Sequence, residues 1–281
     1  MTRRLFAIKA AAVLLCLGSV ADAQTKFNSG QNVQPVFEGW EKNPDGSFNL
    51  MFGYLNRNYV EQPHVSVGTQ NFFSPGETDR GQPTHFYPRR QNYVFKVRVP
   101  ADFGDNDLIW TVTHNGRTDT AIGSLWPVWE VDDAVVKANR GMGISGASVD
   151  NTAPRVSVEG AAQRSTRVGT AVTLAVMAAD DGIPGPNPES ARRRGDRRGR
   201  LGPDTQNMLN PRAAVATGLA VTWLHHRGQG AVTFDPSMPS LEGGRGVTTA
   251  TFSKPGTYIV RAVADDTVLT TFVDVTVVVE R

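Results

Sequence analysis

Short stretches with alternating hydrophobic and polar side chains fill the first half of the chain. At residues 47–54 the side chains of Phe48, Leu50, Phe52 and Tyr54 occupy every second position. A period of two is typical of a strand that buries one face. Stretches of similar character occur at 37–42, 64–68, 93–99, 108–113 and 118–122. No segment of this half has a convincing helical period, so the pattern predicts a β-sandwich.

Two turn signals separate these stretches. Asn43-Pro44-Asp45-Gly46 has proline second and glycine fourth, as a type I turn prefers. Asn115-Gly116 tolerates the positive φ angles that a tight primed turn requires. The second signal therefore predicts a hairpin from the stretches 108–113 and 118–122.

The second half has the same kind of pattern. Tyr258, Val260 and Ala262 alternate and can share one buried face. Strands are predicted at 155–158, 171–178, 219–224, 231–234, 247–252, 258–264 and 273–279. Seven short strands in about 130 residues favour an immunoglobulin-like sandwich.

Composition places the domain boundary near residue 150. Residues 132–139 could form two helical turns, and residues 141–152 are rich in glycine and serine ahead of Pro154. The predicted organisation is a sandwich at 24–140, a linker at 141–152 and a second sandwich at 153–281. The fold class is therefore all-β, with two β-sandwich domains in tandem.

The second sandwich resembles the PKD-like branch of bacterial Ig-like domains. The resemblance covers about residues 153–281 and rests on Leu219-Ala220-Val221-Thr222-Trp223, Gly230-Ala231-Val232-Thr233-Phe234, Ala250-Thr251-Phe252-Ser253, Pro255-Gly256-Thr257-Tyr258 and Ala264-Asp265-Asp266. It implies that Trp223 packs between the sheets, that Tyr258 ties a corner, and that Val260 replaces a disulfide cysteine. The N-terminal half resembles uncharacterised secreted bacterial proteins, which implies no chemistry. Such folds serve many functions.

The N-terminus has the pattern of a cleaved export signal at 1–23. Arg3, Arg4 and Lys9 precede a short apolar run at 10–18, and Ala21-Asp22-Ala23 supplies small residues before a cleavage site. The apolar run is too short to span a bilayer. A retained N-terminal anchor is the alternative. The expected location is the periplasm or the extracellular space.

Cleavage after Ala23 changes the charge and removes the cysteine. It leaves 26 of the 29 Lys and Arg and 26 of the 27 Asp and Glu, so the formal net charge falls from +2 to zero. No global basic charge then favours nucleic acid. Cys16 is the one cysteine of the chain, so the mature chain has no disulfide, cysteine nucleophile or thiolate metal site.

A long basic insertion at 182–217 interrupts the second sandwich. Its proline content and charge predict little regular structure and high mobility. One interpretation is a docking site for polyanions such as acidic polysaccharide, lipid phosphate or nucleic acid; stacking aromatics for single-stranded nucleic acid are absent. The other is a solvated loop. Its arginine run consists of Arg192, Arg193, Arg194, Arg197, Arg198 and Arg200.

Two aspartate pairs are expected at one end of the second sandwich. Asp180-Asp181 and Asp265-Asp266 follow strands whose ends should lie together. Their carboxylates could bind Ca²⁺, which takes six to eight oxygen ligands. Pairing with the inserted arginines and ordinary capping of turns are the alternatives. No other cofactor is expected.

The connection at 74–91 offers a candidate polar site. It contains His85, Arg89 and Arg90, together with Asp79 and Arg80. Long connections are often functional. The alternative is a loop that Phe86 and Tyr87 pack over the sandwich.

Three tryptophans have two interpretations. Trp40, Trp126 and Trp129 could stack against sugars if they are exposed, or fill the core of the sandwich. No nucleophile elbow or phosphate-binding glycine loop is present, and nothing selects a pair of catalytic acids.

Together these patterns predict a secreted or periplasmic, non-catalytic binding protein of the bacterial cell envelope. Its partner would be cell-surface glycan, an envelope polyanion or a protein. A hydrolase with its site around His85 is one alternative, and a structural spacer in an envelope assembly is another.

Overall fold

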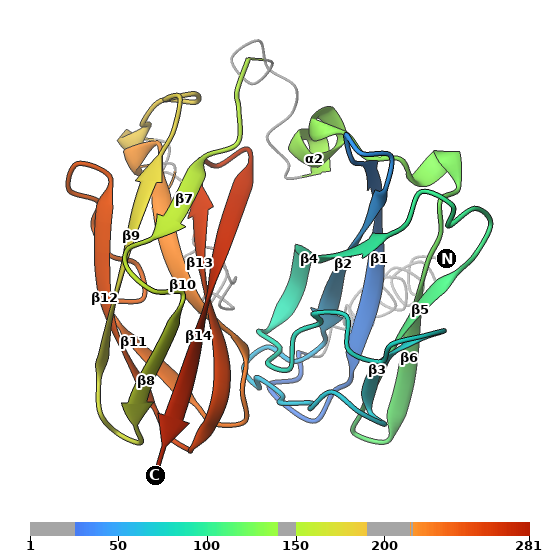
Figure 1. Ribbon diagram of the computed structural model, residues 1–281, viewed down its shortest axis with the longest axis horizontal. Helices are drawn as coiled ribbons and strands as arrows, with labels where there is room; N and C mark the ends of the chain where they lie inside the picture. The colour runs from blue at the N-terminus through green and yellow to red at the C-terminus, as the bar shows by residue number, and fades with distance from the viewer. Residues whose placement is uncertain (1–25, 140–149, 190–213, 215) are drawn as a thin grey trace, which may run out of the picture.

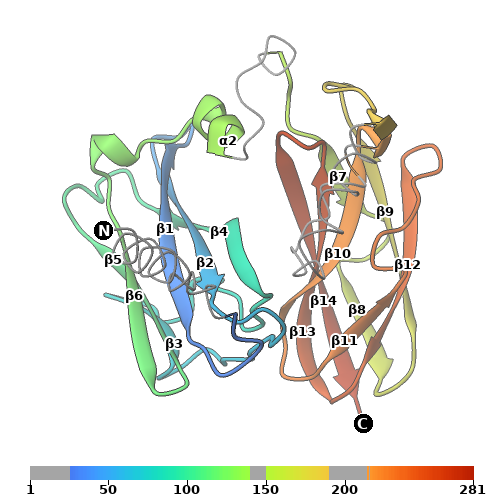
Figure 2. The same cartoon turned by 180° about the vertical axis from the view of Figure 1, so that it is seen from behind.

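The computed structural model describes residues 26–139, 150–189, 214 and 216–281. The chain forms two β-sandwiches that lie side by side (Figures 1 and 2). Each has its own hydrophobic core, within residues 33–121 for the first and 174–279 for the second. The predicted all-β class is confirmed. The linker at 141–152 stays a prediction, because most of it lies outside the described residues.

The first sandwich has two three-stranded antiparallel sheets, with orders β1-β2-β4 and β3-β5-β6. The 3-10 turn η1 (Pro127–Trp129) and the helix α2 (Asp133–Asn139) follow them. The strands are β1 (Val33–Lys42), β2 (Phe48–Asn56), β3 (Asn71–Ser74), β4 (Arg89–Val99), β5 (Leu108–His114) and β6 (Arg117–Gly123).

Aromatic rings from both sheets fill this first core. The ring of Phe52 lies 5.3 Å from Phe73, 5.6 Å from Phe95 and 6.0 Å from Trp110, measured between ring centroids. The alternate side chains of β2 therefore point into the core, as predicted. The predicted hairpin is also confirmed, with β5 paired to β6 and φ angles of 51° and 72° at Asn115 and Gly116.

One predicted strand of this half is wrong. Residues 64–68 form no strand, only isolated bridges from His64 to His85 and from Gly68 to Asn71. The amide of Val65 donates to the carbonyl of Thr84, so this segment pairs with the connection 75–88 instead of a sheet. The strand that pairs with β5 begins at Asn71.

The second sandwich has the strand arrangement of an immunoglobulin domain. Its sheets have the orders β11-β12-β9-β7 and β10-β13-β14-β8. The strands are β7 (Arg155–Val158), β8 (Gln163–Arg167), β9 (Val172–Ala179), β10 (Ala220–Arg227), β11 (Val232–Asp235), β12 (Arg245–Phe252), β13 (Gly256–Asp265) and β14 (Thr270–Glu280). The sequence prediction missed β8, which pairs in parallel with β14.

Trp223 and Tyr258 occupy the positions that the resemblance implied. Both are buried in the second core, and Val260 is buried beside them. The Tyr258 hydroxyl donates to the carbonyl of Lys254 at 2.8 Å, which ties the corner before β13. At Gly228, where φ is +133°, any Cβ would clash with the Tyr258 ring.

Removing the Tyr258 hydroxyl should weaken this corner. We expect Tyr258→Phe to lower the free energy of unfolding by about 1 kcal/mol, because the buried ring stays and one hydrogen bond is lost. Urea denaturation at pH 7 measures the change. Tyr59→Phe is the control, since its hydroxyl makes no hydrogen bond within the described residues, and an equal loss in both variants would contradict the role of the corner.

Candidate functional site

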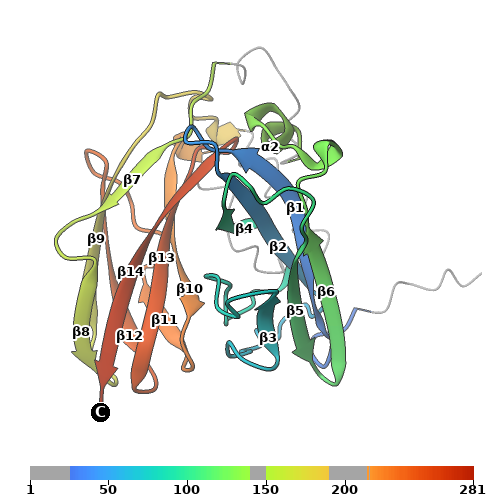
Figure 3. The ribbon, with the colours of Figure 1, turned by 45° about the vertical axis from the view of Figure 1, so that its right-hand side comes forward.

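The connection 75–88 leaves the first sandwich and lies against β10 of the second (Figure 3). The amides of Thr84 and His85 donate to the carbonyl of His226 at 3.1 and 3.4 Å. The amide of Gly228 donates to the Thr84 hydroxyl at 3.1 Å. We call this contact the interdomain interface; it comprises residues 79–87, Val94, residues 225–228 and Arg261.

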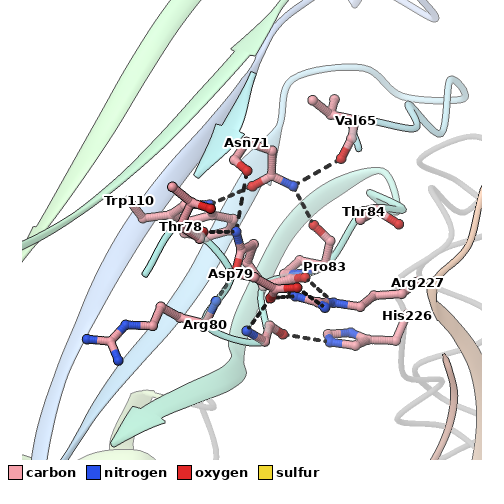
Figure 4. A network of polar contacts seen from close by, with 12 residues as sticks. Val65, Asn71, Thr78, Asp79, Arg80, Pro83, Thr84, Trp110, His226 and Arg227 are labelled. Atoms are coloured by element: carbon pink, nitrogen blue, oxygen red, sulfur yellow. Dashed lines mark hydrogen bonds and ion pairs between the residues drawn. The ribbon is translucent and has the colours of Figure 1, made fainter. Parts of the chain in front are cut away.

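Arg227, at the end of β10, forms side-chain hydrogen bonds across the interdomain interface (Figure 4). Its Nη2 and Nη1 atoms donate to the two carboxylate oxygens of Asp79 at 2.6 and 3.1 Å. Its Nε atom donates to the carbonyl of Gln82 at 2.6 Å. These bonds lower the pKa of Asp79 below its usual range. The guanidinium thus fixes the connection by a carboxylate and a carbonyl together.

Hydrogen bonds from buried amide side chains fix the conformation of the connection that Arg227 contacts (Figure 4). Asn71 donates to the carbonyls of Val65 and Pro83 and accepts a hydrogen bond from the indole of Trp110. Gln82 donates to the carbonyl of Thr78 and accepts from the amide of Arg80. Since Asn71 and Gln82 are fully buried, the loop is anchored to the first core.

Two histidine rings stack across the interdomain interface. The centroids of His85 and His225 lie 4.5 Å apart with an interplanar angle of 22°. Both ring nitrogens of His225 are buried, and neither makes a hydrogen bond of good geometry with a residue that the structure describes. Tyr87 lies beside this pair, and its hydroxyl accepts from the amide of His225 at 2.9 Å.

Burial keeps these histidines neutral. It lowers the pKa of His85 to about 3 and that of His225 to about 4. The pKa of His226 is also lowered by burial, with Arg261 adding to the effect. Neighbouring His64 disfavours protonation of His85 and His225. The histidine cluster is therefore an uncharged contact near pH 7.

A second arginine reaches the first sandwich from the outer face of β13. Arg261 is buried, forms a two-point ion pair with Asp274 at 2.7 and 2.8 Å, and lies 3.7 Å from the centroid of Phe272. Its remaining Nη1 atom donates to the carbonyl of Val94 in β4. The outer face of this sheet is thus bound to the other domain.

The structure separates the residues predicted for the small polar site. His85 lies in the interdomain interface. Arg89 donates to the carbonyl of Arg57 and covers the ring of Tyr59, whereas Arg90 pairs with Glu38 at 2.7 Å. These three side chains are engaged in separate contacts. Of the loop aromatics, Phe86 enters the first core.

All four predicted aspartates accept hydrogen bonds from backbone amides two residues later, as in turns capped by aspartate. The acceptors are Asp180, Asp181, Asp265 and Asp266, and the donors are Gly182, Ile183, Thr267 and Val268. Burial raises the pKa of Asp180 and of Asp266, and their mutual repulsion raises that of Asp266 further.

Asn151 also binds this end, where its amide donates to Asp266 at 3.1 Å. Among the described residues, no group of three or more His, Cys, Asp or Glu side chains could hold a metal ion. Calcium binding stays a prediction.

The arginine run at 192–200 lies outside the described residues. The ends of the insertion meet, because a Cβ placed on Gly218 would lie 3.3 Å from Pro186. The amide of Gly218 donates to the carbonyl of Ala214, which is buried. The chain therefore leaves and re-enters the second sandwich at one place.

The three tryptophans are divided between the core and the surface. Trp40 is buried, while the exposed fractions of Trp126, Val128 and Trp129 are 65%, 80% and 46%. The core interpretation holds for Trp40, and the exposure required for stacking is met by the other two.

The predicted signal at 1–23 lies outside the described residues. In the part of the chain that is described, no helix is long and apolar enough to cross a membrane.

No family model matches the chain, and no curated protein matches it. Among solved structures it is similar to domains 4 and 5 of the S-layer protein SbsC, with 11% identity, a TM-score of 0.27, and coverage of 63% of this chain and 66% of that one. A longer SbsC structure, rSbsC(31-844), matches at 10% identity and a TM-score of 0.27 over 89% of this chain and 29% of that one. The D0-D1 domain of intimin matches at 10% identity and a TM-score of 0.24 over 87% and 97%. This chain thus spans less than two thirds of the longer SbsC structure and about two thirds of the shorter one, and likenesses this weak carry no argument about function.

Proposed function

We propose that this chain is an exported, non-catalytic binding protein of the bacterial cell envelope whose two sandwiches act as one rigid unit. The interdomain interface is the observation that supports this proposal most directly. A two-point arginine pair, backbone hydrogen bonds and stacked rings join the domains. Rigid presentation of surfaces reduces the entropy lost when a partner binds.

The location of His85 favours binding over hydrolysis. A catalytic base must reach the proton that it removes from a substrate. The ring of His85 instead stacks on His225 of the second sandwich, and its Nε2 atom lies 2.9 Å from the side-chain oxygen of Gln62. A hydrolase would therefore need another base, or an opened interdomain interface.

A structural spacer is the second candidate, and the same rigid interface favours it. The two functions differ in whether the protein has a ligand of its own. The export pattern at 1–23, the PKD-like resemblance and the basic insertion support an envelope location and a glycan, polyanion or protein partner. Those features come from the sequence, and the periplasm and the extracellular space remain open.

Sedimentation with purified cell envelopes tests the proposal. The probe is the chain 24–281, and a variant lacking residues 190–201 measures the part played by the arginine run. We expect saturable binding and no turnover of ester, glycoside or peptide substrates. Absence of binding would leave the spacer, and turnover lost in His85→Ala would establish the hydrolase instead.

A further inference from the structure

Two exposed indoles stand close together on a single turn of the first sandwich. Trp126 precedes η1 and Trp129 ends it, and both side chains are exposed together with Val128. The other three tryptophans of the chain, Trp40, Trp110 and Trp223, are buried. An exposed patch of large apolar side chains on a well-packed domain is a sign of a contact surface.

This turn is held rigidly to the sandwich. The amide of Trp129 donates to the carbonyl of Trp126 at 2.9 Å, which closes the turn. The indole of Trp40 donates to the same carbonyl at 2.9 Å, and the amide of Val131 donates to the carbonyl of Trp40 at 2.8 Å. The rings of Phe37 and Trp129 meet edge to face at 5.7 Å.

Gly39 lets the segment lie this close to β1. Its φ angle is +126°, and a Cβ there would approach the carbonyl oxygen of Trp129 to 2.5 Å. Pro127 further restricts the turn. The exposed indoles therefore lose little backbone freedom when they bind a ligand.

The charges beside the turn select among possible ligands. Glu130 and Asp132 are exposed next to the tryptophans, and one oxygen of Asp132 caps α2 by accepting from the amide of Val135. Surfaces that bind anionic lipid or nucleic acid need lysine and arginine beside their aromatic residues. Carboxylates instead accept hydrogen bonds from neutral hydroxyl groups.

We infer that Trp126 and Trp129 form a stacking platform for a neutral polysaccharide of equatorially substituted hexopyranose units. The flat C–H face of such a ring packs on an indole, and its hydroxyl groups donate to the flanking carboxylates. The inference rests on the proposed binding function and names its ligand class. The turn η1 lies near α2, at the end of the first sandwich away from the connection 75–88 (Figures 1 and 2). Both indoles are exposed, so the interdomain interface does not cover them.

Acrylamide quenching of tryptophan fluorescence tests the platform, because the quencher reaches Trp126 and Trp129 far more readily than the three buried indoles. The probes are laminarin and hydroxyethylcellulose, with alginate as an anionic polysaccharide and phosphatidylcholine–phosphatidylglycerol vesicles as a lipid surface. We expect at least one neutral polysaccharide to protect the indoles, and alginate and vesicles to have no effect.

Variants identify the residues responsible. Trp126→Ala should weaken binding of the protecting polysaccharide about tenfold in an isothermal titration, as loss of a buried aromatic contact does. Trp126→Ala/Trp129→Ala should abolish it, and Trp126→Tyr should retain part of it. Phe27→Ala is the matched control, since that aromatic side chain is 49% exposed elsewhere, and it should bind as wild type does.

Three outcomes would overturn the inference. They are unchanged affinity in Trp126→Ala, protection by vesicles but by no polysaccharide, and no protection by any neutral polysaccharide. Envelope sedimentation separates this failure from that of the proposed function. If one of these three outcomes is found while the wild-type protein still binds envelopes, the platform alone is refuted, whereas wild-type protein that does not bind envelopes refutes the proposed function.

Discussion

Arg227→Ala should uncouple the two sandwiches. The substitution removes the pair with Asp79 and leaves the buried carbonyl of Gln82 without its donor. The Arg227 side chain is 16% exposed but that of Asp79 is 53% exposed, so solvent screens the ion pair and we expect a loss of about 1–2 kcal/mol of interface free energy, mostly from the bond to Gln82. We expect the radius of gyration in small-angle X-ray scattering to rise, and calorimetric unfolding to separate into two transitions.

Arg245→Ala is a matched control for this prediction. Arg245 also bonds both oxygens of a carboxylate, that of Glu159, but within the second sandwich and with a side chain that is 51% exposed. Its loss should cost less than about 1 kcal/mol and leave the scattering unchanged. The radius of gyration of Arg227→Lys should lie between those of wild type and Arg227→Ala, because an ammonium group keeps the charge but cannot make the two-point contact. Equal scattering from Arg227→Ala and Arg245→Ala would show that Arg227 does not hold the domains together.

Acidification from pH 7 to pH 4 should destabilise the folded protein. The pKa values of His85 and His225 are about 3 and about 4 in the folded chain, whereas an unfolded histidine has a pKa of about 6.5. Between these values the unfolded chain binds protons that the folded chain does not. The contribution of the two neutral histidines to the free energy of unfolding is therefore fully present above pH 6.5. It is lost as the pH falls toward 4, by roughly 3 kcal/mol for His225 alone.

His225→Leu tests the origin of this pH dependence. Among the described residues, none makes a hydrogen bond of good geometry with the His225 ring, so an apolar side chain of similar size should cost little at pH 7. Urea denaturation from pH 7.5 to 4 should give a shallower slope for this variant than for wild type. Carboxyl groups such as Asp266 titrate alike in each protein and cancel in the comparison. An unchanged slope in His225→Leu would show that His225 does not cause the pH dependence of the free energy of unfolding.

Most strands could be predicted because one face of each is hydrophobic. Two strands were not predicted, β3 and β8, and β8 has the sequence Gln163-Arg164-Ser165-Thr166-Arg167, which contains no hydrophobic side chain. The backbone of β8 forms hydrogen bonds with the edge of β14, and this pairing, not the burial of apolar side chains, accounts for the strand. The strand predicted at 64–68 is wrong for the opposite reason. Its apolar residues Val65 and Val67 alternate as in a strand, but Val65 is buried where the segment pairs with the connection 75–88 and not with a sheet.

The interdomain interface could not be predicted from local patterns. Arg227 and Asp79 are 148 positions apart, and each resembles an ordinary charged loop residue in sequence. One signal was present in β10, where Leu224 and His226 would point away from the core that contains Trp223. Both are buried, and a strand with two covered faces implies a third layer. The sequence does not show that this layer comes from the other domain.

The exposed tryptophans show a different limit of sequence reasoning. Trp40, Trp126 and Trp129 have the same chemistry, and alternation cannot place residues of a short turn. Trp40 is buried and Trp129 exposed because of the irregularity at Gly39. There β1 shifts register against β2, and the backbone of Trp129 lies close against the glycine. That shift depends on backbone geometry, for which the sequence offers only a glycine.

The contact between Pro186 and Gly218 has a consequence for how this architecture can diversify. Two anchor points that touch impose almost the same closure entropy whether few or many residues run between them. Sequence between these anchors can therefore be lengthened, shortened or exchanged, provided that the buried Ala214 stays in place. An engineered tag or a foreign peptide placed there should be tolerated, whereas the same insertion in the connection 75–88 would break the contact that joins the domains.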